Sequence, residues 1–253
     1  MALIVAVVVF CGLFGGALLG MMTARSLQEH HLSDRSQEAV KLGVGMVAAM
    51  TSLILGLMTA SVKQTFDTTS RDVQQFATYL VTLDTALRLY GPDASTAQAA
   101  LAAYTRQTID ERWPAAPRPG QAEDNALGSE TLMIRVGTAI RALKPAAAEQ
   151  VDLRAEALDR FKMLSSLRWT VMTESVTTVS PVFIMVLIIW MTLIFFSFGL
   201  FAPPNAVPLI AFLLCAACLA AALFIILEMG APFGGLMTVP KDPMVRALAH
   251  MQS

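Results

Sequence analysis

The chain has 253 residues, of which 55% are hydrophobic and only 15% are charged, and its formal net charge is −1 at pH 7. Soluble domains carry about 25% charged residues, so this composition argues against an ordinary soluble protein. The near-neutral charge also argues against nucleic acid as a partner, because nucleic-acid-binding proteins usually present a basic surface.

Four uncharged segments of about 20 residues each account for the apolar composition. They are residues 2–22, 42–62, 181–201 and 206–227. An apolar helix of about 20 residues crosses the roughly 30 Å of hydrocarbon in a bilayer. The sequence therefore predicts an all-α integral membrane protein with four transmembrane helices in two hairpins. The first segment is predicted to be a retained span, since no basic residue precedes it and its apolar run exceeds the ~7–15 residues of a signal peptide.

Small residues recur along the first two spans at a spacing that lines one helix face. The first span carries Gly12, Gly16 and Gly20, and the second carries Gly45, Ala49, Ser52, Gly56 and Ala60. Such faces let helices approach closely in lipid. Tight packing is predicted, against a partner helix either in the same chain or in another copy.

The loop between these two spans contains Glu29, His30, His31 and Asp34. These residues could bind a metal or sense pH, because histidine titrates near neutrality. Two adjacent histidines on one short loop do not complete a metal site. A solvated loop without a metal is the expectation.

The second span offers a candidate pore lining on the side opposite its small residues. This side carries Val47, Met50, Ile54 and Met58, with Ser61 at its inner end. Several copies meeting around an axis would form a narrow apolar constriction, of the kind that gates by dewetting. The alternative is that the same side chains face lipid or other spans.

Beyond residue 62 the chain becomes polar but keeps a helical rhythm. Apolar residues alternate at spacings of three and four: Val73, Phe76, Leu80, Leu83, Leu87 and Tyr90. This pattern is typical of the seam of a coiled coil or helix bundle. A continuous helix over 42–90, roughly 70 Å long, is predicted to end at Gly91-Pro92-Asp93.

Residues 63–180 are predicted to form a helical domain, and proline, glycine and polar residues indicate where its other helices begin and end. Helices are expected at 94–112, 130–143 and 146–178, with a loop at the proline-rich segment 114–129. Ser180 is expected to cap the third span, which begins at Pro181.

The second hairpin, 181–229, turns at Pro203-Pro204-Asn205, where Asn205 is expected to cap the fourth span. The tail, 230–253, contains a predicted short amphipathic helix at 240–251 along the inner membrane surface.

Lysine and arginine near the span ends predict the orientation. On the side of both termini and the central domain lie Lys63, Arg71, Arg160, Lys162, Arg168, Lys241 and Arg246, against Arg25, Arg35 and Lys41 on the other. This bias places the termini and residues 63–180 in the cytoplasm.

The chain shows no catalytic signature, and we do not expect it to be an enzyme or to hold a cofactor. Gly43-Val-Gly45-Met-Val-Ala48 matches a dinucleotide motif in letters only, because no strand precedes it. Cys215 and Cys218 form a C-x-x-C inside an apolar span, where small packing residues are expected and not a redox site. Hydroxyls in the spans are expected to bond their own helix backbone.

Three blocks carry a family resemblance: "LGLMTASVKQTFDTTSRDV" with "TLDTALRLYGPDA", then "WMTLIFFSFGLFAPPNA", and "FIILEMGAPFGGLMTVPKDPMVRALAHM". Together they resemble the bestrophin-like domain family of bacterial membrane proteins. Met229-Gly230 and Pro203-Pro204-Asn205 depart from that pattern and lack charged groups expected there. The resemblance implies kinship with bestrophins, which are pentameric anion channels whose second span lines the pore.

Glu228 ends the fourth span, where the negative end of the helix dipole disfavours a carboxylate unless it is paired. Lys63 and Arg168 are the candidate partners in an ion pair at the membrane edge. A role in ion passage and a solvated position are the alternatives.

Two functions follow from this reading. The first is a homo-oligomeric channel, a pentamer by analogy, passing small inorganic ions, anions by resemblance, across a bacterial inner membrane. The second is a non-conducting scaffold that recruits partners through its cytoplasmic helices.

Overall fold

The computed structural model of the chain describes residues 2–26, 34–114, 121–174, 181–203 and 205–253. All regular elements in these ranges are helices. The chain divides into two compact units, which we call the first unit (Met1–Thr65 and Thr178–Ala231) and the second unit (Phe66–Thr177 and Pro232–Ser253).

Four of the described helices are long and apolar enough to cross a membrane. They are α1 (Ala2–Ser26), α2 (Asp34–Tyr90), α6 (Pro181–Leu200) and α7 (Ala206–Met229). The prediction of four apolar helices is confirmed. The cap predicted for α7 is confirmed as well, because the side chain of Asn205 accepts a hydrogen bond of 3.2 Å from the backbone N–H of Val207. The cap predicted at Ser180 lies outside the described residues.

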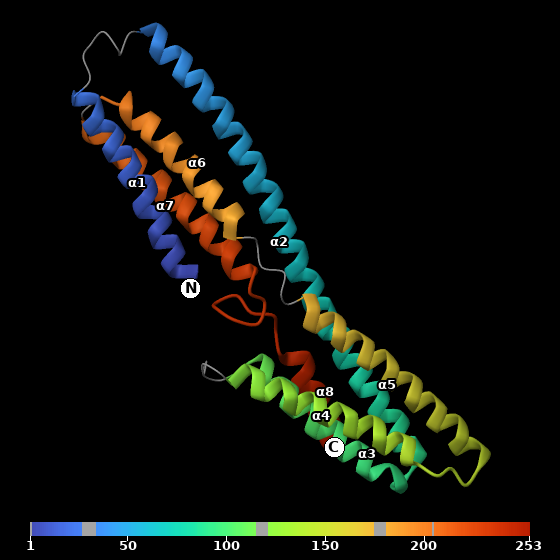
Figure 1. Cartoon of the computed structure of the whole chain (residues 1–253). Helices are drawn as coiled ribbons and strands as arrows, with labels where there is room; N and C mark the ends of the chain where they lie inside the picture. Colours follow the sequence, from blue (N-terminus) through green and yellow to red (C-terminus); the bar gives the residue numbers. More distant parts are fainter. Residues whose placement is uncertain (1, 27–33, 115–120, 175–180, 204) are drawn as a thin grey trace. The chain divides into compact units, whose positions relative to one another are not determined.

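In the first unit, α1 lies beside α6 and α7, as Figure 1 shows. The three helices share one apolar core, to which Leu13, Phe195 and Leu223 contribute buried side chains. All three helices are apolar around their whole circumference, so their composition does not mark which side faces the others. The close packing is decided instead by residue size.

Glycines bring the backbones of α1 and α6 into contact. A Cβ added at Gly16 would lie 3.0 Å from the backbone oxygen of Thr192, and one added at Gly20 would overlap the backbone oxygen of Phe196. From the opposite side, a Cβ at Gly199 would overlap the backbone of Ala17. The close approach predicted from the first span is confirmed, and its partner lies within the same chain.

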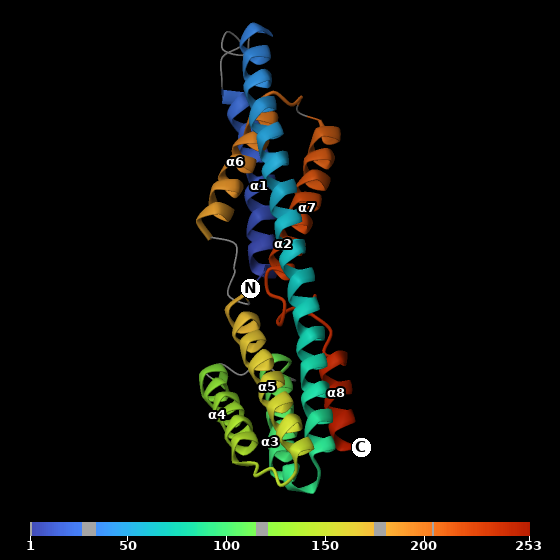
Figure 2. The same cartoon turned by 90° about the vertical axis from the view of Figure 1, so that its right-hand side faces the viewer.

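Helix α2 is one continuous helix of 57 residues, visible as an unbroken ribbon in Figure 2. At 1.5 Å per residue it is roughly 85 Å long. It begins eight residues before the predicted start at residue 42 and ends, as predicted, before Gly91. Gly91 has a φ of 109°, a conformation that favours glycine, and Pro92 then opens a short 3-10 helix, η2 (Pro92–Ala94).

The predicted seam of α2 forms the centre of the second unit. Its residues from Val73 to Tyr90 are buried, and Leu80, Leu83 and Leu87 are completely so. The seam packs in one cluster with side chains from α3 (Ser95–Arg112), α4 (Gln121–Ala142) and α5 (Ala148–Glu174). The predicted helices at 94–112 and 146–178 therefore correspond to α3 and α5.

The predicted loop at 114–129 is wrong for its second half, because α4 begins at Gln121. The loop was predicted from the proline and polar residues of this segment, and its last two residues, Gly128 and Ser129, are of types that disfavour helix interiors. In the structure a Cβ at Gly128 would lie 3.4 Å from Nε2 of Gln107 on α3, and Ser129 is completely buried. Packing against α3 therefore outweighs the weak helix propensity.

The predicted amphipathic helix of the tail is α8 (Asp242–Gln252), but its expected position on the membrane surface is wrong. Its apolar residues Met244 and Ala247 are buried in the core of the second unit. The amphipathic pattern indicates only that the apolar face of the helix is covered. Either a membrane surface or a protein core can cover such a face.

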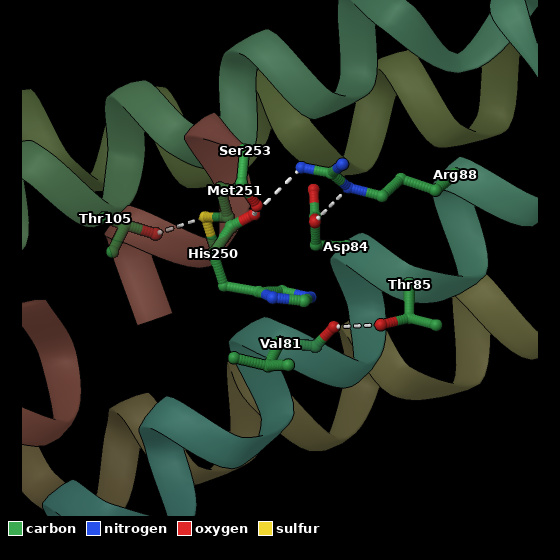
Figure 3. A network of polar contacts seen from close by, with 8 residues as sticks. All are labelled: Val81, Asp84, Thr85, Arg88, Thr105, His250, Met251 and Ser253. Carbon is green, nitrogen blue, oxygen red and sulfur yellow. Dashed lines mark hydrogen bonds and ion pairs between the residues drawn. The ribbon is translucent and has the colours of Figure 1, made fainter. Parts of the chain in front are cut away.

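A polar network fixes the end of α8 to α2 (Figure 3). Arg88 Nε lies 2.7 Å from Oδ2 of Asp84, whose side chain is only 1% exposed. The Nη2 of the same guanidinium donates a 2.9 Å hydrogen bond to the carbonyl oxygen of His250. Carbonyls in the last turn of a helix lack intrahelical donors, so Arg88 supplies one here while it pairs the buried carboxylate.

Candidate functional site

The membrane segment of α2 presents a buried face that packs within the chain. At about 100° per residue, Thr51, Leu55, Met58 and Val62 share this face, which we call the packing stripe. Met58 and Val62 are buried in a small cluster with Leu187 of α6 and Ile226 of α7. The first unit therefore covers one side of α2 and leaves the others open.

Of the five predicted pore-lining residues, four lie beside the packing stripe and the fifth, Met58, belongs to it, and they are exposed to different degrees. Val47 is 38% exposed and Met50 57%, while Ser61 is also exposed. Ile54 is half-buried, and Met58 is only 8% exposed because it also belongs to the packing stripe. The structure thus places Val47, Met50 and Ser61 on an open face and Met58 in an intrachain contact.

Val47 and Met50 line an apolar groove between α2 and α6 with a volume of about 410 Å³. The groove is lined by Val44, Val47, Met50, Trp190, Leu193, Ile194 and Ser197. Sequence reasoning missed the four residues from α6. The uniformly apolar sequence of α6 contains no periodic signal that could have identified them.

The second open face of α2 is the one formed by its small residues. Gly45, Ala49, Ser52, Gly56 and Ala60 are all exposed, and we call them the small stripe. Within the described residues, a Cβ added at Gly45 or Gly56 would meet nothing within 4 Å. Unlike the small face of α1, this stripe has room for a closely packed helix that the described part of the chain does not supply.

Hydroxyls in the spans bond to their own helices, as predicted. The Oγ1 atoms of Thr51, Thr59 and Thr192 donate to the carbonyl oxygens four residues earlier, at 2.8, 2.7 and 2.7 Å. The hydroxyl donors of these side chains are therefore satisfied within their own helices, and the three threonines do not form a polar pathway by themselves.

Glu228 lies at the end of α7 and is buried, with 9% of its surface exposed. Lys63 is exposed on α2, and both side chains take part in polar or electrostatic interactions. Arg168 belongs to the second unit, where its Nη2 donates to Oγ of Ser129 at 3.4 Å. An ion pair of Glu228 with Lys63 or Arg168 stays a prediction.

The remaining candidate groups do not assemble into a reactive centre in the described part of the chain. His30 and His31 lie outside the described residues, and the described ranges contain no group of His, Cys, Asp and Glu suited to a metal ion. Cys11, Cys215 and Cys218 are free and exposed on the surfaces of their helices. They are thus not packed inside the first unit, and their expected role as small packing residues stays a prediction.

Comparison with known proteins gives one match. The family model described as the bestrophin-like domain matches residues 11–244, which is nearly the whole chain. No curated protein and no solved structure matches the sequence significantly.

Proposed function

The chain belongs to the bestrophin-like domain family, and from this premise we propose that it forms a homo-oligomeric channel for small anions with α2 lining a central pore. By analogy with bestrophins, the oligomer would be a pentamer. The proposed topology has two membrane hairpins, with residues 63–180 and both termini in the cytoplasm of a bacterium and the spans in its inner membrane. Lipid and small inorganic ions are the expected partners.

The observation that carries the proposal is the poor coverage of α2. Only 11% of its most apolar window is buried inside the chain, against 22% in each of the other three candidate spans. A pore-lining helix in a ring of copies needs one face toward the axis and others toward neighbouring copies. The small stripe and the open residues Val47 and Met50 supply such faces on opposite sides of the packing stripe.

The scaffold alternative loses its main support. A scaffold would recruit partners through its cytoplasmic helices, and the apolar seam of α2 is the surface that their sequence offers for this purpose. In the structure the seam from Val73 to Tyr90 is buried by the second unit itself. We therefore propose that copies of the chain contact one another through the membrane segment of α2.

Gly56→Leu is expected to reduce the oligomer to smaller species while the chain stays folded. The leucine has open space around it within the chain, so it interferes only with a helix from another copy. The mass of the purified protein in mild detergent, together with its circular dichroism, measures both effects. Gly43→Leu is the control for the added bulk, because its site is equally open but lies on the face of Met50 and not in the small stripe, so the contact between neighbouring copies should remain. A parent protein that is monomeric in mild detergent would exclude the central pore.

Flux from liposomes tests conduction. Vesicles containing the full chain are expected to release chloride faster than empty vesicles and faster than they release potassium, each ion measured separately with an ion-selective electrode. A stable oligomer that releases neither ion would leave the scaffold as the better description. Equal release of both ions would argue for a pore without anion preference.

A further inference from the structure

The segment between α7 and α8 contains a closed loop, residues 232–239, which we call the tail loop. The backbone N–H of Val239 donates a 2.8 Å hydrogen bond to the carbonyl oxygen of Pro232, and this bond closes the loop at its base. Gly235, near the tip, has a φ of 102°, a conformation that favours glycine and lets the chain reverse its direction. Pro232 and Val239 are both buried, so the base of the loop is packed into the second unit.

Side chains at the end of α3 hold the base of the tail loop. Trp113 Nε1 donates a 2.8 Å hydrogen bond to the carbonyl oxygen of Val239. The ring of Phe233 packs edge-on against the Trp113 ring, with 5.4 Å between the ring centroids, and the guanidinium carbon of Arg112 lies 5.2 Å from the centre of the Phe233 ring. Phe233 also lines a small pocket at Tyr104 together with side chains from α2, α3 and α5. The conformation of the tail loop is thus set at its base and not at its tip.

The tip of the tail loop exposes two large apolar side chains. Leu236 is 83% exposed, more than any other large apolar side chain in the described residues, and Met237 is 42% exposed. The sequence from Met229 to Pro240 contains no charged residue, so contact with an apolar partner would dehydrate no charge in this stretch. Single exposed apolar side chains are common on protein surfaces. The place of this pair in the chain therefore decides what it contacts.

The tail loop begins where α7 leaves the apolar part of a membrane. Residues 206–227 are uncharged and measure about 33 Å as a helix, slightly more than the roughly 30 Å of hydrocarbon in a bilayer. The backbone N–H groups of Gly230 and Ala231 still donate to carbonyl oxygens of α7, at 3.1 Å each, so the chain has no slack there. Pro232 follows the end of α7 by three residues, which reach at most about 11 Å when fully extended. A bilayer that α7 crosses therefore brings its headgroup region to the tail loop, whatever the number of copies.

We propose that the tip of the tail loop inserts into the interfacial region of the membrane that α7 spans, with the side chains of Leu236 and Met237 among the upper parts of the lipid acyl chains. Apolar side chains that enter the boundary between headgroups and acyl chains by about 5–10 Å bind proteins to membrane surfaces in this way. Because Trp113 holds the base of the loop, the insertion anchors the second unit to lipid. The contact depends neither on conduction nor on the number of copies, and its test needs no flux.

An environment-sensitive dye at the tip tests the insertion in the full chain in lipid nanodiscs. Leu236→Cys is labelled with a nitrobenzoxadiazole dye after alanine has replaced the native Cys11, Cys215 and Cys218. Leu89→Cys is the matched control, because Leu89 is 67% exposed but lies about 40 Å farther along α2 than the end of the apolar segment at residue 62. A phospholipid with a nitroxide near the top of its acyl chain is expected to quench the dye at position 236 several-fold more than the dye at position 89. Emission from position 236 should also lie at a shorter wavelength.

A dye beside the tip separates the effect of the two apolar side chains from that of the dye itself. With the dye on Thr238→Cys, replacing Leu236 and Met237 together by serine is expected to lower quenching by the nitroxide lipid several-fold. Leu89→Ser, which removes another exposed leucine, should leave this quenching unchanged. All four side chains are exposed, so the circular dichroism of these variants should match that of the parent.

Two results would overturn the proposal. Equal quenching by the nitroxide lipid at positions 236 and 89 would place the tip outside the lipid. In that case, short-wavelength emission that the labelled protein keeps in detergent would indicate a neighbouring copy at the tip, and emission like that from position 89 would indicate water. Quenching at position 238 that the double serine variant retains would show that the chain alone, and not its two apolar side chains, keeps the loop near lipid.

Discussion

Gly20→Ala is expected to lower the free energy of unfolding by about 1–3 kcal/mol, the usual cost of overpacking a well-packed contact. The added methyl group would overlap the backbone oxygen of Phe196 and lie 2.8 Å from the backbone nitrogen of Leu200. Backbone atoms cannot rotate away as a flexible side chain can, so α1 and α6 must separate. A fall in the thermal midpoint of the purified protein, followed by circular dichroism in detergent, measures the loss.

Gly15→Ala provides the matched control for this prediction. It lies on the same helix, but an added Cβ there meets nothing within 4 Å among the described residues. Alanine is a better helix former than glycine by up to about 1 kcal/mol, so the control should be neutral or slightly stabilising. If the two alanine variants had equal thermal midpoints, the close contact between α1 and α6 would be contradicted.

Met50→Ala is expected to raise chloride flux through the oligomer. If Met50 projects into an apolar neck, shortening it in every copy widens the constriction and lowers the cost of wetting it. The side chain is 57% exposed within the chain, so its truncation leaves no intrachain cavity and should hardly change the thermal midpoint. Flux from liposomes and thermal unfolding of the same preparation are the two measurements.

Met58→Ala makes the same chemical change two turns farther along α2, where the side chain is only 8% exposed. There it packs with Leu187 and Ile226, and truncation of a buried methionine costs about 2–5 kcal/mol. The thermal midpoint should therefore fall. Unchanged flux in an intact, conducting Met50→Ala oligomer would assign Met50 to a lipid or groove contact.

The sequence predicted the helices well where periodicity and breakers agree. The seam from Val73 to Tyr90 alternates strictly and is followed by Gly91 and Pro92, and the helix ends there. The prediction failed where a local signal competed with packing, as at Gly128 and Ser129 inside α4.

The candidate site was only partly predictable for a different reason. Spacing along α2 separated the small stripe from Val47 and Met50, but it did not reveal that Met58 is covered by α6 and α7. The spacing of residues along α2 also could not predict the pocket at Tyr104, because side chains from four segments distant in sequence line that pocket. Lipid-facing and protein-facing surfaces of apolar spans have the same composition, so a single sequence does not distinguish them.

The unbroken course of α2 has a consequence for how its faces are related. Because each residue turns the helix by about 100°, the angular offset between the seam and the small stripe is set solely by the number of residues between them. One residue inserted between Thr65 and Val73 would shift the phase of the two faces by about 100°, whereas seven would restore it to within about 20°. The number of residues in this segment therefore sets, along α2 itself, the angle between the helix face that carries the small stripe and the face that carries the seam.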